Sequence, residues 1–77
     1  MNKLNLIIDY HSNVITPDKR VYPSYADAEN FIERKVEKLA DALWDIEEIC
    51  GSNSKKGQIN CRHFNGAEIT IKWEQEL

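Results

Sequence analysis

Hydrophobic and polar positions alternate at the start of the chain. Leu4, Leu6, Ile8 and Tyr10 are separated by single residues that are mostly polar. A period of two residues is typical of a strand with one buried face. The pattern predicts a first strand over residues 4–10.

The next residues predict turns and a second, irregular strand. Residues 11–13 and 16–19 have the composition of turns, and Pro17 occupies the favoured second position of the latter. Residues 14–15 and 20–22 can extend between and after these turns. Because proline cannot donate a backbone hydrogen bond, Pro17 indicates a strand at the edge of the sheet.

The middle of the chain has the spacing of one long amphipathic helix. Its apolar residues recur at steps of three and four: Tyr25, Ala28, Ile32, Val36, Leu39, Leu43, Ile46 and Cys50. Ser24 and Asp27 form an approximate capping box, and Gly51 is a residue that ends helices. We therefore expect a helix from Tyr25 to Cys50. A coiled-coil seam is the alternative, but the strands on both sides favour packing on a sheet.

A polar loop over residues 52–57 precedes two strands joined around Asn65-Gly66, which is a strong hairpin signal. A two-residue loop would put the apolar residues of the two strands on opposite faces. A three-residue loop, Phe64-Asn65-Gly66 with a bulge at Gly66, puts the following residues on one face: Ile59, Cys61, Ile69, Ile71 and Trp73. We prefer the bulged hairpin.

These elements predict a single α+β domain over residues 1–77, in ββαββ order. A four-stranded antiparallel sheet would carry one long helix on one face. A chain of 77 residues buries a small core, so dimerisation would be a natural source of added stability. No apolar stretch is long enough to span a bilayer and no signal peptide is recognisable, so we expect a cytoplasmic protein whose Cys50 and Cys61 are reduced thiols.

Negative charge is concentrated in the expected helix. The net charge of the chain is −3, whereas residues 25–50 hold eight acidic and three basic residues and therefore carry −5. Five of the acids follow one another at four-residue steps: Glu29, Glu33, Glu37, Asp41 and Asp45. Residues four apart are neighbours on a helix surface. This distribution argues against direct nucleic-acid binding and favours a basic partner protein.

Trp44 falls outside the apolar stripe of the expected helix, among Asp41, Asp45 and Glu48. A tryptophan among carboxylates is typical of an interface anchor. The simpler alternatives are an ordinary solvated helix face and a Trp44 ring that folds over a sheet edge. We predict the following partner-binding residues: Glu33, Glu37, Asp41, Trp44, Asp45 and Glu48.

Catalytic and metal motifs are weak. Cys61 and His63 point to one side of a strand, but their spacing fits no common zinc pattern. Asp9, His11 and Ser12 have the residue types of a catalytic triad, but such a run at a strand end is more simply a turn with local hydrogen bonds. We expect no catalytic residue, no metal and no cofactor.

The function that this pattern favours is a small non-enzymatic inhibitor. Its acidic helix face would block a basic, nucleic-acid-binding site on a partner such as a nuclease. In size, charge and architecture it is similar to anti-CRISPR and anti-restriction proteins of phages and to immunity proteins of nuclease toxins. The alternative is a homodimeric assembly module with no inhibitory activity.

Overall fold

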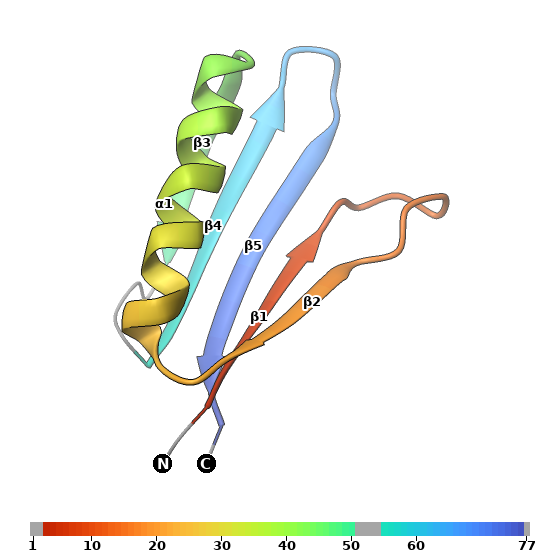
Figure 1. The fold of residues 1–77 in the computed structure, drawn as a ribbon. Helices are drawn as coiled ribbons and strands as arrows, with labels where there is room; N and C mark the ends of the chain where they lie inside the picture. Colours follow the sequence, from red (N-terminus) through yellow and green to blue (C-terminus); the bar gives the residue numbers. More distant parts are fainter. Residues whose placement is uncertain (1–2, 51–54, 77) are drawn as a thin grey trace.

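A computed structural model describes residues 3–50 and 55–76 of the chain. Within these ranges one helix and five strands follow one another (Figure 1). Their bounds are β1 Leu4–Asp9, β2 Asp18–Tyr22, α1 Tyr25–Asp41, β3 Trp44–Cys50, β4 Lys56–His63 and β5 Glu68–Gln75.

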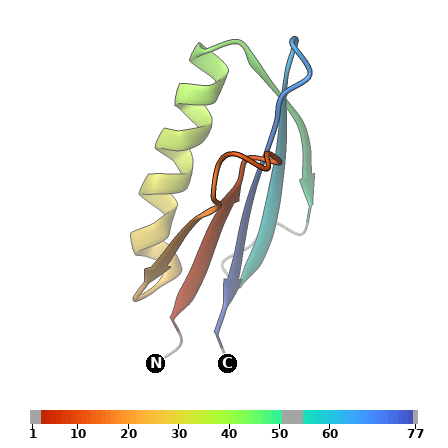
Figure 2. The same ribbon diagram turned by 90° about the vertical axis from the view of Figure 1, so that its right-hand side faces the viewer.

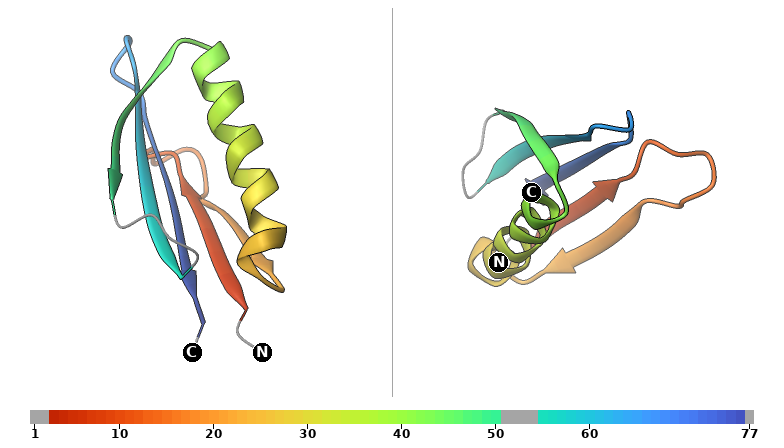
Figure 3. Two further views of the ribbon diagram at one scale, coloured as in Figure 1. Left: turned by 90° about the vertical axis from the view of Figure 1, so that its left-hand side faces the viewer. Right: turned by 90° about the horizontal axis from the view of Figure 1, so that it is seen from above.

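The strands form a single antiparallel sheet in the order β2-β1-β5-β4-β3. The last strand in the chain, β5, lies between β1 and β4, and β2 and β3 are the two edges. Helix α1 covers one face of the sheet, and no described element covers the other (Figures 2 and 3). The α+β class is confirmed. The prediction of four strands in ββαββ order is wrong, because the sheet has a fifth strand, β3.

The core lies between α1 and the covered face of the sheet. Residues at alternating positions of β1, β4 and β5 meet one side of the helix, as the period-two and period-three-to-four patterns predicted. The buried apolar residues are Leu4, Leu6, Ile8, Ala28, Ile32, Leu39, Ile59, Cys61, Ile69, Ile71 and Trp73.

The largest correction concerns the helix, which ends at Asp41 rather than at Cys50. The backbone N–H of Ala42 closes the last turn on Lys38 O and Leu39 O, and Leu43 then adopts a left-handed conformation with φ 67°. The chain turns there and returns as strand β3. Gly51, the predicted helix terminator, lies outside the described residues.

The sequence pattern did not predict strand β3, because a β-bulge interrupts the alternation of its side chains. Its pairing with β4 shifts between Ile46 and Glu48. A bulge inserts one extra residue, so the alternation of faces breaks at that point. Ile46 and Ile49 consequently lie three residues apart but oppose Cys61 and Ile59, which share the covered face. That spacing is indistinguishable from a helical one in the sequence alone.

The start of the helix is where the sequence predicted it, with Ser24 as the N-cap residue. The capping box is incomplete, since the Ser24 hydroxyl donates to Asp27 Oδ2 at 2.8 Å instead of accepting a backbone N–H. Strand β2 begins directly after Pro17 and is an edge strand, as expected, but residues 14–15 are not part of any strand.

The β4–β5 hairpin confirms the three-residue loop. The N–H of His63 donates to Ala67 O and the N–H of Gly66 donates to His63 O, each at 2.9 Å, and Gly66 has φ 93°. This geometry is that of a turn followed by a glycine bulge. Ile59 pairs with Ile71 in the resulting register, which places both on the covered face.

A packing contact and a backbone hydrogen bond lie at the lower end of the sheet in Figure 1. Gly57 pairs with Trp73, and a Cβ atom built on Gly57 would lie 2.1 Å from Trp73 Cζ2, so the indole ring occupies the space that a side chain would need. The N–H of Glu76 donates to Lys3 O at 2.7 Å, which extends the β1–β5 pairing beyond both strands.

Candidate functional site

Helix α1 carries an acidic column on its exposed side. We use this name for Glu29, Glu33, Glu37 and Asp41, all of which are exposed. The structure shows no side-chain hydrogen bond or ion pair for these four residues within residues 3–50 and 55–76. Burial, and then the negative charges of Glu29 and Glu33, raise the pKa of Tyr25 at the first turn. The column is thus a source of negative potential that Arg34 and Lys38, which precede Glu37 and Asp41 by three residues, offset only in part.

The basic residues of α1 form no ion pair with the acidic column among the described residues. The ammonium group of Lys35 lies over the Tyr10 ring, 5.8 Å from its centroid, on the side of the helix that faces the first strand. Arg34 and Lys38 are exposed and form a shorter row beside the column. The helix therefore presents two neighbouring stripes of opposite sign, of which the acidic one is longer.

Trp44 does not lie on the helix. It is the first residue of β3, is half-buried against the core, and packs its ring against His63 at a centroid distance of 5.1 Å. His63 in turn packs against Phe64, whose ring is exposed at the hairpin turn. Trp44 is therefore part of the edge strand itself, and its ring packs against the core instead of joining the acidic face of α1.

The acids of β3 are separated from the acidic column by the sheet. Asp45 pairs with Arg62, and Glu47 forms an ion pair with the same guanidinium at 3.4 Å. Arg62 also binds Glu68, and hydrogen bonding to Glu68 together with the charge of Glu47 raises the pKa of Arg62. Glu48 lies on β3, but its side chain is outside what the structure describes. The structure thus brings Glu33, Glu37 and Asp41 together and places Asp45 elsewhere.

A polar network crosses the uncovered face at the centre of the sheet. The Thr70 hydroxyl lies 2.6 Å from His11 Nε2 and donates to Asn60 Oδ1 at 3.1 Å, and Gln58 Nε2 donates to the same oxygen. The Thr70 hydroxyl thereby connects His11 to Asn60 and Gln58, and the role of His11 Nε2 as donor or acceptor depends on the tautomer of its ring.

The triad candidates form local turns, as the simpler reading predicted. The backbone N–H of His11 donates to Asp9 Oδ1 at 2.9 Å, and the N–H of Val14 donates to Ser12 Oγ at 3.1 Å. His11 has φ 47°, and this bend carries its ring over Thr70. Each of the three side chains is thus engaged separately from the other two.

The metal candidates are also dispersed. Cys61 is buried in the core, where burial raises the pKa of its thiol, while His63 is engaged by its two ring contacts. In the part of the chain that the structure describes, three or more His, Cys, Asp or Glu side chains do not converge as a metal site.

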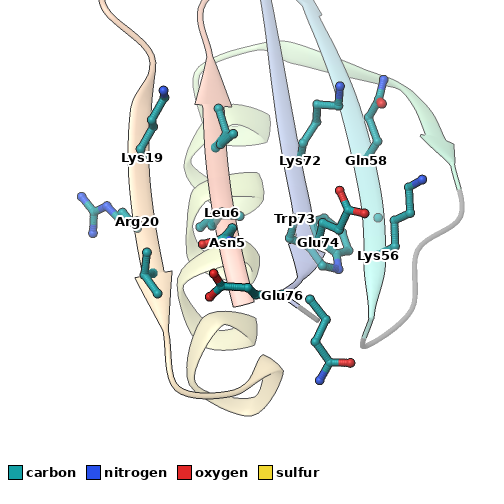
Figure 4. A pocket seen from close by; sticks show the side chains of 14 residues that line it. Asn5, Leu6, Lys19, Arg20, Lys56, Gln58, Lys72, Trp73, Glu74 and Glu76 are labelled. Carbon is teal, nitrogen blue, oxygen red and sulfur yellow. The ribbon is translucent and has the colours of Figure 1, made fainter. Parts of the chain in front are cut away.

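Sequence reasoning missed a groove on the uncovered face. It has a volume of about 810 Å³ and runs across β2, β1, β5 and β4 at the lower end of the sheet (Figure 4). Lys19, Lys72 and Lys56 enter it from three different strands. These lysines are far apart in the sequence, so only the strand order, with β5 beside β1, brings them together.

Two opposite surfaces are therefore candidate functional sites: the acidic column on the helix side and the lysine-lined groove on the uncovered face of the sheet.

Helix α1 is too short and too polar to cross a membrane, and the described residues contain no other helix. No protein-family model, curated protein or solved structure matches the chain.

Proposed function

We propose that the protein is a non-enzymatic inhibitor whose acidic column occupies a basic site on a partner protein. The observation that carries this proposal is the exposure of four carboxylates at four-residue steps on α1, for which the described part of the chain supplies no ion-pair partner. Like charges at four-residue steps destabilise a helix by a few tenths of a kcal/mol per pair, roughly. A basic partner surface would relieve that repulsion.

The proposed partner is a nuclease or another protein that binds nucleic acid. Carboxylates spaced about 6 Å apart along a helix present negative charge at intervals comparable with those of backbone phosphates. A groove lined with lysine and arginine would attract this column and could not hold nucleic acid at the same time. Electrostatic complementarity of this kind chiefly raises the association rate and selects the partner.

The correction to the helix changes which residues take part. Glu33, Glu37 and Asp41 form the proposed contact, with Glu29 extending it toward the start of the helix. Asp45 is neighbour to Arg62, and Trp44 packs on the core, so neither supplies the centre of this surface. The proposed contact is accordingly polar and sensitive to salt, since exposed charge pairs are screened within about 10 Å at 0.1 M ionic strength.

The test is a charge reversal with a matched control. Glu33→Lys combined with Glu37→Lys should abolish binding of proteins captured from a lysate at low salt, and duplex DNA should displace those proteins from the unmodified chain. Glu74→Lys combined with Glu76→Lys changes the net charge equally on the uncovered face and should leave capture intact. Equal loss in both variants, or capture that DNA does not disturb, would contradict the proposal.

Exposed apolar residues at β2 support a second candidate, a homodimeric assembly module. Val21 on this edge strand is 62% exposed, and Val14 and Ile15 in the preceding loop are exposed as well. An unpaired edge strand is a template for pairing with another chain. Sedimentation at rising concentration should then give twice the chain mass of 9.0 kDa, and Val21→Pro should return the single-chain mass. A monomer at every concentration would exclude this candidate.

A further inference from the structure

The uncovered face of the sheet is organised in rows of cross-strand neighbours. One row within the groove runs across four strands in the order Lys19, Ile7, Lys72, Gln58. Directly opposed residues of adjacent antiparallel strands have Cβ atoms about 5 Å apart. Two lysine side chains therefore flank one half-buried isoleucine, and the row contains no acid.

The structure shows no ion pair for Lys19 or Lys72 among the described residues. Arg20, which also borders the groove, is directed elsewhere: its guanidinium lies 4.3 Å from the Phe31 ring centroid and contacts Asp18. In Figure 4 the Arg20 side chain points outward from β2, whereas Lys19 on β2 and Lys72 on β5 lie on either side of β1. The positive charge of the groove is thus centred on Lys19 and Lys72.

The adjacent row limits the size of this positive region. It runs in the order Val21, Asn5, Glu74, Lys56, so that Lys56 and Glu74 are cross-strand neighbours of opposite charge. Val21 is largely exposed and extends the apolar surface of Ile7 toward the edge of the sheet.

Acidic residues flank the lysine row along the direction of the strands. On one side the His11 ring lies over Thr70, in the row beyond Ile7 and Lys72, and Asp9 belongs to that same row. On the other side the carboxylates of Glu74 and Glu76 line the groove. A chain of phosphates or an acidic peptide would run from the lysine row onto these acids, whereas a compact anion would not.

We propose that this groove binds a small amphipathic anion, namely a carboxylate, sulfonate or phosphate carried on an apolar body. The anionic group would lie between the ammonium groups of Lys19 and Lys72, and the apolar body would cover Ile7 and Val21. The amides of Gln58 and Asn5 supply hydrogen bonds at the margin. A volume of about 810 Å³ is within the range of small-molecule sites. This site lies on the opposite side of the sheet from the acidic column and does not depend on it.

The test uses 8-anilinonaphthalene-1-sulfonate, an aromatic sulfonate, as the probe with the intact chain at low ionic strength. Fluorescence and calorimetric titrations should show one saturable site per chain. Lys19→Met and Lys72→Met keep the apolar stem but remove the charge, and each should weaken binding about fivefold, the effect of losing about 1 kcal/mol of ionic contact. Lys38→Met, on the helix, is the matched control and should bind like the unmodified chain.

Two further measurements make the result decisive. The uncharged analogue N-phenyl-1-naphthylamine should bind more weakly than the sulfonate, and its affinity should not respond to the two lysine substitutions. Cooperative thermal unfolding of every variant checks that the probe reports a folded chain. Non-saturating binding, equal affinity in all variants, or a single-stranded oligonucleotide that binds more tightly than the sulfonate through the same lysines would overturn the proposal.

Discussion

The two faces of the sheet are built from the same strands but are used in opposite ways. On the covered face, Leu6 and Ile71 are removed from solvent and pack against α1. On the uncovered face, the residues next to them in sequence, Ile7 and Lys72, remain accessible and border a groove. Side-chain alternation thus gives one strand two different faces, of which one is buried in the core and the other remains accessible to solvent.

The first way to test this division is to remove the same side chain from each face. Ile71→Ala should lower the free energy of unfolding by about 3–4 kcal/mol, because it deletes a fully buried side chain from a packed core. Ile7→Ala should cost about 1 kcal/mol, because its side chain is only half-buried. Chemical denaturation of both variants measures the difference. Similar losses would show that the uncovered face is also part of the core.

Neighbouring residues of β4 provide the second comparison. Gly57→Ala should cost about 2–3 kcal/mol, because its new methyl group would overlap the buried indole of Trp73 and force it to move. Gln58→Ala, one residue on and facing the other way, should cost less than about 1 kcal/mol, since it loses only the hydrogen bond to Asn60. Thermal unfolding of the pair provides the measurement. A tolerated Gly57→Ala would mean that Trp73 has another place to pack.

The third comparison concerns Thr70, the one described polar residue on the uncovered face that is buried. Thr70→Val keeps the shape but removes the hydroxyl that connects His11 to Asn60. We expect a loss of about 1 kcal/mol, since both partners can turn to water. The His11 ring should also become more mobile, which its NMR line shapes would report. Unchanged stability together with an unchanged His11 signal would show that the network is incidental.

The smallest expected effect is a pH dependence from the covered face. Burial raises the pKa of the Cys61 thiol above its usual value, so above about pH 8.5 the unfolded chain releases this proton while the folded chain keeps it. The folded state then binds more protons, and stability falls as the pH rises. Cys61→Ala should remove most of this slope when denaturation is followed between pH 7.5 and about 9, where the tyrosines of the unfolded chain are still largely protonated. Identical slopes in both proteins would refute the assignment.

Much of the covered face was predictable from sequence. The alternation over Leu4, Leu6 and Ile8, the inner stripe of α1 and the bulged β4–β5 hairpin each have a local signal, and the structure confirms them. These features depend on periodicity and on turn residues, both of which can be read from short contiguous segments of the sequence.

Strand β3 was not predictable for a specific physical reason. The left-handed position after a helix is usually occupied by glycine or asparagine, but here Leu43 adopts that conformation with its side chain exposed. No residue between Asp41 and Trp44 signals that the helix stops. The bulge after Ile46 then imitates a helical spacing. These two local exceptions explain why the sequence pattern predicted a helix that continues past Asp41 and placed Trp44 and Asp45 on the wrong surface.

The groove was not predictable because its residues are distant in sequence. Lys19 and Lys72 become neighbours of Ile7 only when β2 and β5 flank β1. By contrast, the predicted acidic row lies on α1 as far as Asp41, where the helix ends. Residues four apart on one helix are neighbours whatever the tertiary structure, so this part of the row could be predicted from the sequence.

The position of β5 also has a consequence for how the chain folds. Until β5 pairs, β1 and β2 on one side and β3 and β4 on the other are two separate hairpins with no hydrogen bond between them. Joining them requires β1 to meet β5 across almost the whole sequence, and such long-range closure slows folding. A chain in which β5 has not yet paired therefore exposes the apolar faces of both hairpins and of α1, and exposure of this kind favours aggregation.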